Sequence, residues 1–170
     1  HPFLNSIGLF RSEFIYLDNS TNPTLEQQSS VLEEITKKFT GTIVYRTLDI
    51  GGDKQVGYLN LPIEENPFLG VRGIRLSLRN IDLFDSQIKS ILSSKSLERI
   101  KIMFPMISTI EDFIEAKEFV NKIAKELNVE VPPMGIMVET PASAFIADKF
   151  SEIVDFISIG TNDLTQYIMA

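Results

Sequence analysis

Short apolar runs recur along the chain, and most of them are apolar on both faces instead of alternating with polar residues. Four such runs are rich in β-branched residues: Thr42 to Ile50, Arg99 to Ile107, Pro133 to Glu139 and Val154 to Gly160. Strands that are apolar on both faces are typical of a parallel sheet covered by helices. The stretch from Ser6 to Leu17 is a further candidate, a strand followed by a loop and a helical start.

The segments between these runs have a helical period. Apolar residues recur at spacings of three and four between Leu25 and Phe39 and again between Ile110 and Leu127, which makes one apolar stripe on each segment. Ser108 to Glu111 fits a capping box, and Thr140-Pro141 fits a cap followed by proline at the first helical position. Alternating strands and helices predict parallel strands with right-handed crossovers, in either a closed barrel or an open doubly wound sheet.

Composition and charge narrow the class of protein. With 170 residues, 44% of them hydrophobic and 23% charged, the chain can bury a core, and no repeat or linker divides it. The balance of 16 basic against 23 acidic residues gives a net charge of −7, so we expect no nucleic-acid partner. No apolar stretch approaches the roughly 18 residues that cross a bilayer, so we expect no membrane insertion and a cytoplasmic setting.

Two residue types are nearly missing, and this removes several kinds of chemistry. The sequence has no cysteine, which excludes disulfides, thiolate metal sites and cysteine catalysis within these residues. His1 is the only histidine. A Ser/His/Asp triad and a phosphohistidine buried in the fold therefore lack their central residue.

Polar and charged residues gather where the predicted strands end. In parallel α/β folds, ligands bind beyond the carboxyl ends of the strands. Two carboxylates there, Glu139 and Asp163, suit Mg²⁺, which keeps waters and takes further oxygens from a phosphorylated substrate. Arginines at the other exits supply planar forks for phosphate or carboxylate. They are Arg11, Arg46 and Arg72.

Together these residues indicate a doubly anionic ligand bound with a hard cation. The alternative for each residue alone is a salt bridge or a helix cap, and Asn162 and Asp163 stand where a helix start prefers such residues. Lys54, after a glycine pair that is not a nucleotide motif, either reaches an anion or is solvated.

Six segments, in order over nearly the whole chain, resemble enzyme I of the bacterial sugar phosphotransferase system, the phosphoenolpyruvate-protein phosphotransferase family. They are GLFRSEF, RTLDIGGDK, ENPFLGVRGIR, MFPMI, MVETPAS and SIGTNDLTQY. The resemblance implies a TIM (β/α)₈ barrel with parallel strands that binds phosphoenolpyruvate and Mg²⁺. It also implies a homodimeric enzyme that phosphorylates its own histidine and then a small phosphocarrier protein for sugar uptake.

The same resemblance implies roles for individual residues. By matching motif, Glu139 and Asp163 are the metal ligands. The residues implied to hold the phosphoryl and enolate oxygens are Arg11, Arg46, Arg72, Asn162 and Lys54. The expected cofactor is therefore Mg²⁺, and the expected substrate is phosphoenolpyruvate.

The sequence also lacks several features of the family pattern. The family's proton-donating cysteine, a further arginine, the phosphohistidine domain, the first barrel strand and the last two strands have no counterpart in the sequence. We therefore expect residues 1–170 to form an incomplete phosphoenolpyruvate-binding barrel domain without catalytic residues, inactive alone. Two alternatives stay open. One is a fragment of a pyruvate phosphate dikinase or phosphoenolpyruvate synthase, which the wording RTLDIGGDK disfavours; the other is a non-catalytic binding or regulatory remnant.

Overall fold

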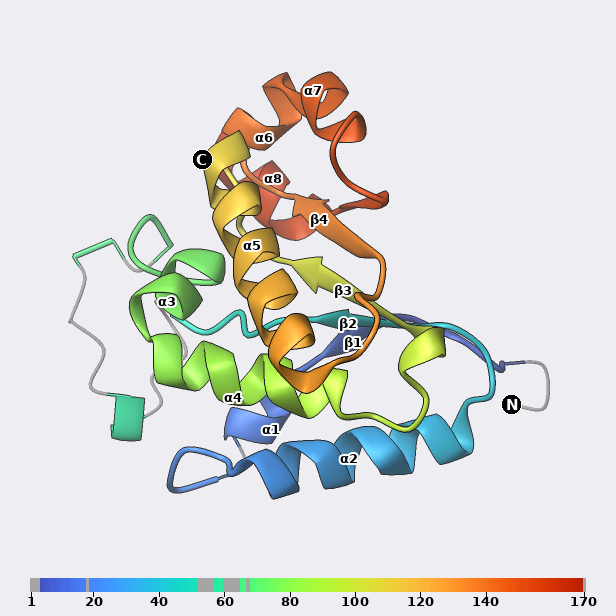
Figure 1. Ribbon diagram of the computed structural model, residues 1–170. Helices are drawn as coiled ribbons and strands as arrows, with labels where there is room; N and C mark the ends of the chain where they lie inside the picture. Colours follow the sequence, from blue (N-terminus) through green and yellow to red (C-terminus); the bar gives the residue numbers. More distant parts are fainter. Residues whose placement is uncertain (1–3, 18, 52–56, 60–64, 67, 170) are drawn as a thin grey trace.

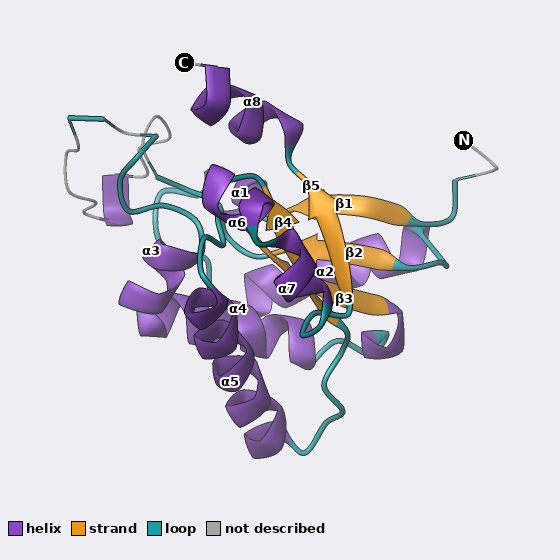
Figure 2. Ribbon diagram, turned by 90° about the horizontal axis from the view of Figure 1, so that it is seen from above, coloured by secondary structure: helices purple, strands orange, loops and turns teal. Residues whose placement is uncertain are grey.

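One parallel sheet organises the chain. The computed structural model describes residues 4–17, 19–51, 57–59, 65–66 and 68–169. The strands are β1 (Ile7–Arg11), β2 (Ile43–Arg46), β3 (Ile100–Phe104), β4 (Met134–Val138) and β5 (Phe156–Ile159). They pair in the order β1-β2-β3-β4-β5, every neighbouring pair parallel. The sheet curls into a half-barrel, which confirms the predicted partial barrel (Figure 2).

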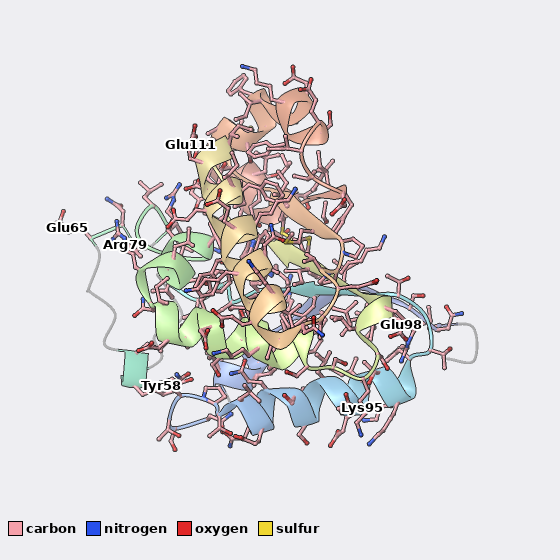
Figure 3. The ribbon with its side chains drawn as sticks, in the orientation of Figure 1. Tyr58, Glu65, Arg79, Lys95, Glu98 and Glu111 are labelled. Atoms are coloured by element: carbon pink, nitrogen blue, oxygen red, sulfur yellow. The ribbon has the colours of Figure 1, made fainter. Side chains whose placement is uncertain are left out.

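Helices follow the strands. They are α1 (Glu13–Leu17), α2 (Leu25–Lys38), α3 (Ile74–Arg79), α4 (Ile81–Leu92), α5 (Ile110–Leu127), α6 (Pro141–Phe145), α7 (Ala147–Ser151) and α8 (Thr161–Met169). Helices α2, α4 and α5 cover the outer face of the sheet (Figure 1). Helix α4 packs between α2 and α5, as Figure 1 shows. Exposed charged side chains include Glu111 on α5, and Lys95 and Glu98 in the connection between α4 and β3 (Figure 3).

The core lies between the sheet and these helices, as the apolar stripes predicted. Its main cluster joins strand residues such as Tyr45, Ile102 and Ile136 to Ile88 of α4 and Val120 of α5. A smaller cluster lies under α1 and includes Leu48, Ile50 and Leu83. No helix among the described residues is long and apolar enough to span a membrane.

Helix caps are placed by short polar side chains. Thr140 caps α6 with Pro141 in its first turn, as predicted. The predicted box from Ser108 to Glu111 was wrong by one residue, because Thr109 is the N-cap of α5 and Asp112 closes the box. Asp112 takes this role because its Oδ2 accepts hydrogen bonds from the backbone N–H groups of both Ser108 and Thr109, at 3.0 and 2.9 Å.

The strands are shorter than the apolar runs that predicted them. Strand β2 ends at Arg46 although the run continues to Ile50, and β3 ends at Phe104 although its run continues to Ile107. The residues beyond each end stay buried, because they turn over the edge of the sheet and pack beneath the loops there. All five carboxyl ends point to this one edge, where the predicted polar residues also lie (Figure 1).

Candidate functional site

A small cavity opens at the carboxyl edge of the sheet. Arg11 and Arg46 stand side by side in the register of β1 and β2. Glu139 directly follows β4, and Asn162 and Asp163 lie in the first turn of α8, after β5. These five residues line one cavity of about 200 Å³, together with parts of β1, β4 and β5. The fold thus gathers residues that are up to 152 positions apart, from 11 to 163, around one hollow.

An alternating row of charges runs beside this cavity. Arg46 bonds to Glu13 and, through Nη1, to Asp49 Oδ2 at 3.1 Å. Arg72 continues the row, with Nη2 3.2 Å from Asp49 Oδ1 and Nη1 2.8 Å from Asp163 Oδ1. Each buried guanidinium therefore lies between two carboxylates, which offsets the cost of removing the charges from water.

The two arginines keep unused donors. The Nε–H groups of Arg46 and Arg72 are buried and have no hydrogen-bond partner among the described residues. Burial alone lowers the pKa of Arg72, but the carboxylates of Asp49 and Asp163 more than reverse this and raise the pKa above its ordinary value. Both groups are therefore cations with free capacity beside the cavity, which suits an anionic ligand.

Glu139 is the most deeply buried charged residue of the cavity, with none of its surface exposed. Its Oε1 accepts a 2.6 Å hydrogen bond from the backbone N–H of Met106, while Oε2 has no partner among the described residues. Burial, followed by the charge of Asp49, raises the pKa of Glu139 to about 7. A buried oxygen without a partner is costly, so this carboxylate is arranged for a cation that would bind there.

Two glycines make the space that Glu139 and Met106 occupy. A Cβ on Gly160 would lie 2.6 Å from both Cβ and Oε2 of Glu139. Gly73 has φ 56°, and a Cβ there would lie 2.8 Å from Cβ of Met106. Met106 itself has φ 58°, a left-handed conformation that costs a non-glycine residue about 1 kcal/mol and is found at functional sites. This conformation aims the N–H of Met106 at Glu139.

The donor set fits Mg²⁺ and does not form a complete protein cage. Within the described residues, no group of three or more His, Cys, Asp or Glu side chains is placed to hold a metal ion. Mg²⁺ usually takes only one or two carboxylates and completes its octahedron with water and substrate oxygens. The unpartnered Oε2 of Glu139 and the carboxylate of Asp163, both on the cavity wall, meet that requirement.

The structure brings together most of the residues that the sequence singled out. Arg11, which is exposed, Arg46, Glu139, Asn162 and Asp163 line the cavity. Arg72 lies behind it and reaches it through Asp163. Lys54 falls outside the described residues.

Sequence reasoning missed three participants. Glu13 and Asp49, which lie just beyond the ends of β1 and β2, received no role in the sequence analysis, although both are buried partners of Arg46. For Asp49 a signal was available, since an acidic residue three positions beyond a strand-end arginine can fold back onto it. Glu13 follows Arg11 but pairs with Arg46 on the neighbouring strand, which the sequence does not indicate. The Met106 N–H gave no signal, because a backbone donor is invisible in the residue types.

Comparison with known proteins gives the family. The family model described as "PEP-utilising enzyme, PEP-binding domain" matches residues 3–170. A phosphoenolpyruvate-protein phosphotransferase of Haloferax volcanii is 48% identical over 98% of the chain, and one of Mycoplasma capricolum is 45% identical over 96%. A multiphosphoryl transfer protein of Xanthomonas campestris is 46% identical over 96% of the chain. The chain spans 31%, 30% and 20% of these three relatives.

Solved structures of lower identity share the fold. Malate synthase of Haloferax volcanii, in a magnesium and glyoxylate complex, superposes with a TM-score of 0.55 at 18% identity, over 86% of this chain and 39% of that one. A citrate lyase from Burkholderia xenovorans has a TM-score of 0.50 at 14% identity, over 97% of this chain and 50% of that one. From the family match and the identity of its relatives, the chain belongs to the PEP-utilising enzymes, and its residues 3–170 match their PEP-binding domain.

Proposed function

We propose that this chain is the part of a phosphoenolpyruvate-protein phosphotransferase that binds phosphoenolpyruvate together with Mg²⁺. One observation carries the proposal. Cationic Arg46 and Arg72 lie beside a cavity that Glu139 also lines, and among the described residues their Nε–H groups and the buried Oε2 of Glu139 have no partner. Phosphoenolpyruvate needs such a mixed site, because its phosphoryl and carboxylate groups require cations on two sides.

The roles of the arginines follow from their places. Arg11 and Arg46, in register on neighbouring strands, present two guanidinium groups at the cavity wall. Arg46 is fixed by Glu13 and Asp49, so its orientation is set before a ligand arrives. Groups that are held in place beforehand stabilise developing charge without further reorganisation. We assign Arg11 and Arg46 to the phosphoryl group, with Asn162 as a neutral donor beside them.

Glu139 and Asp163 would hold the metal ion. Glu139 is oriented by the Met106 N–H, and Asp163 must give up its ion pair with Arg72 in order to ligate. That exchange frees Nη1 of Arg72 for an oxygen of the substrate. When bound, Mg²⁺ supplies charge stabilisation for a phosphoryl group that is nearly detached in the transition state.

The activity of the whole protein is part of the same proposal. The three relatives reported above are three times as long as this chain or longer, so the phosphoryl acceptor and the proton donor would come from other parts. We propose a histidine acceptor, a phosphocarrier partner, a homodimeric enzyme and a cytoplasmic setting, as the resemblance implies. Because the sequence has no cysteine and only His1, we expect no pyruvate release by the 170 residues alone.

The named relatives favour a phosphotransferase over a dikinase or a synthase, since all three reported above transfer phosphoryl groups by name and none is named for a nucleotide. A non-catalytic remnant would have no need to keep Glu139 buried without a partner, because such a group costs stability.

Titration calorimetry tests the proposal. Phosphoenolpyruvate should bind the chain saturably when Mg²⁺ is present in excess. Glu139→Gln and Asp163→Asn should each weaken binding at least about tenfold, which is the loss of one charged ligand. Asp148→Asn, an exposed carboxylate in the first turn of α7, is the matched control and should bind as the unchanged chain does. Equal affinity in all four proteins would reject the assignment.

A further inference from the structure

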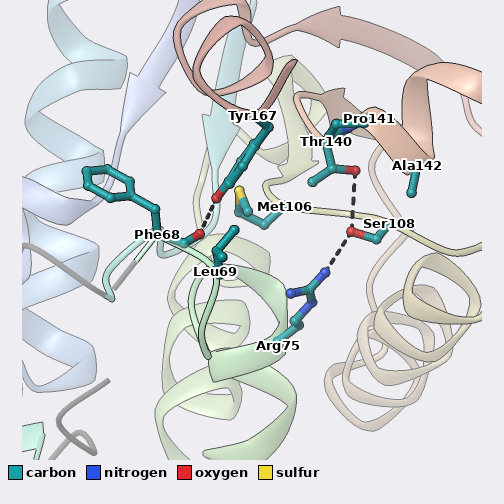
Figure 4. Close-up of a pocket in the computed structure, with 9 residues that line it drawn as sticks. All are labelled: Phe68, Leu69, Arg75, Met106, Ser108, Thr140, Pro141, Ala142 and Tyr167. Atoms are coloured by element: carbon teal, nitrogen blue, oxygen red, sulfur yellow. Dashed lines mark hydrogen bonds between the residues drawn. The ribbon is translucent and has the colours of Figure 1, made fainter. Parts of the chain in front are cut away.

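A second hollow lies at the same edge of the sheet. It has a volume of about 260 Å³ and shares no lining residue with the candidate cavity. Figure 4 shows its walls, which come from α3, the loop after β3, the start of α6 and the end of α8. Met106, Pro141 and Tyr167 form its apolar part, and Arg75 and Ser108 form its polar part.

Arg75 also lies at this edge, and no carboxylate among the described residues balances its charge. Its Nη2 donates a 2.8 Å hydrogen bond to the hydroxyl of Ser108, and no carboxylate of the described chain pairs with it. Arg46 and Arg72, by contrast, each lie between two carboxylates. The side chain of Arg75 is only half-buried, so its remaining N–H groups can reach a ligand in the hollow.

The hydroxyls around Arg75 are already committed. The Ser108 hydroxyl donates to Thr140 Oγ1 at 3.3 Å, and the Thr140 hydroxyl donates to the carbonyl of Ile107 at 3.1 Å. This chain of hydrogen bonds holds the guanidinium in place and supplies no negative charge. The hollow thus has one fixed positive group that no described carboxylate neutralises, a pattern that favours an anion.

The wall opposite Arg75 is apolar, and the hollow is small. The hydroxyl of Tyr167 donates to the backbone carbonyl of Phe68, which turns the ring toward the hollow and uses its polar group (Figure 4). Met106 is almost fully buried beneath the hollow. A volume of about 260 Å³ is slightly below the roughly 300 Å³ at which ligand sites usually begin, so the occupant is small.

We propose that this second hollow binds a small monocarboxylate with an apolar body, its carboxylate on Arg75 and its body against Met106 and Tyr167. A carboxylate is favoured over a phosphate because one guanidinium fork matches one carboxylate, whereas a phosphate dianion would keep an unpaired charge. The proposal does not depend on the function of the neighbouring cavity.

Benzoate is a suitable probe, and its neutral relative benzamide is the control ligand. By ligand-observed NMR and calorimetry, benzoate should bind the chain saturably with a Kd of about 1 mM, the range expected for so small a molecule. Benzamide should bind at least about tenfold more weakly, because it lacks the charge that Arg75 pairs with. Equal binding of the two ligands, or no saturation by benzoate, would overturn the proposal.

Variants place the binding in the second hollow. Arg75→Gln should abolish benzoate binding. Arg79→Gln is the matched control, because Arg79 lies on the same helix but is exposed and is not among the residues that line the hollow. It should bind benzoate normally. Binding that survives Arg75→Gln, or that Arg79→Gln abolishes equally, would refute the site.

A second variant tests the site even if Arg75→Gln does not fold. Ala142→Phe adds a ring at an exposed lining position and should block benzoate without removing any charge. Asp163→Asn should leave benzoate binding unchanged, since Asp163 lines the candidate cavity and is not among the residues that line the second hollow. A loss of phosphoenolpyruvate binding with benzoate binding intact would therefore count against the proposed function alone.

Discussion

Nη1 of Arg72 lies 2.8 Å from Oδ1 of Asp163, and this ion pair joins the segment before α3 to the first turn of α8. The other end of the guanidinium is held by Asp49, with Nη2 3.2 Å from both carboxylate oxygens. In the ligand-free chain, a proposed metal ligand and a proposed substrate contact thus satisfy each other. Metal and substrate should therefore enter this site together, since each one releases the partner of the other.

The pairing predicts opposite effects of one substitution on the two ligands. In Arg72→Gln, Asp163 loses its counter-charge, so Mn²⁺ without substrate should bind about three- to tenfold more tightly. Phosphoenolpyruvate should bind at least about tenfold more weakly, because an anion contact is gone. Electron paramagnetic resonance of free Mn²⁺ and calorimetry measure the two affinities.

Arg79→Gln serves as the control for this experiment, because it removes the same charge from an exposed position. Since loss of one member of a buried ion pair costs about 3–5 kcal/mol, thermal unfolding must first show that Arg72→Gln is folded at the assay temperature. Weaker Mn²⁺ binding in folded Arg72→Gln would contradict the proposed competition for Asp163.

Glu139 should make the stability of the metal-free chain depend on pH. Its pKa in the folded chain is raised from 4.5 to about 7, so the folded state holds this proton more tightly than the unfolded state does. The resulting stabilisation is fully present below pH 4.5 and is lost as the pH rises through 7. Its size is no more than about 3 kcal/mol.

Other carboxylates also titrate in this range, so the informative quantity is the difference in free energy of unfolding between the unchanged chain and Glu139→Gln. Urea unfolding in a chelator, from pH 4.5 to pH 8, should show the unchanged chain losing stability relative to Glu139→Gln as the pH rises from 4.5 to about 7, with little further change above that. The amide mimics the protonated acid and cannot ionise. A constant difference between the two proteins across this range would mean that Glu139 is not a buried acid.

Gly160 should be required for metal binding but not for formation of β5, the strand that precedes it. Gly160→Ala would place a methyl group 2.6 Å from Oε2 of Glu139, where the metal would bind, so the affinity for Mn²⁺ should fall at least about tenfold. Gly8→Ala is the matched control, because a Cβ on this glycine of β1 meets nothing within 4 Å. Equal Mn²⁺ affinity of the two variants would show that Gly160 does not shape the site.

Residue patterns predicted the sheet and the edge that carries the cavity, because both follow from periodicity and from the direction of parallel strands. Arg46, Glu139 and Asp163 meet where strand exits must meet. The partners within the site were less accessible. Asp49 could have bound solvent or another helix, and its place between Arg46 and Arg72 depends on how the chain turns after β2.

The second hollow was beyond prediction for the same reason. Arg75 resembles any arginine at the start of an amphipathic helix, and only the packed structure shows that no described carboxylate faces it. Met106 is a similar case, because its left-handed conformation follows from close contact with Gly73 and not from a preference of methionine. Side-chain type predicted the charges, whereas tertiary packing decided their partners.

The most direct measurement of the central claim is the linkage between metal and substrate in the unchanged chain. Mn²⁺ affinity would be measured by electron paramagnetic resonance with and without saturating phosphoenolpyruvate, with Asp163→Asn in parallel. If Glu139, Asp163 and the substrate share one ion, phosphoenolpyruvate should raise the Mn²⁺ affinity at least about tenfold, and Mn²⁺ should raise the phosphoenolpyruvate affinity by the same factor. This linkage should disappear in Asp163→Asn. Independent binding of the two ligands to the unchanged chain, or equal linkage in both proteins, would contradict the account.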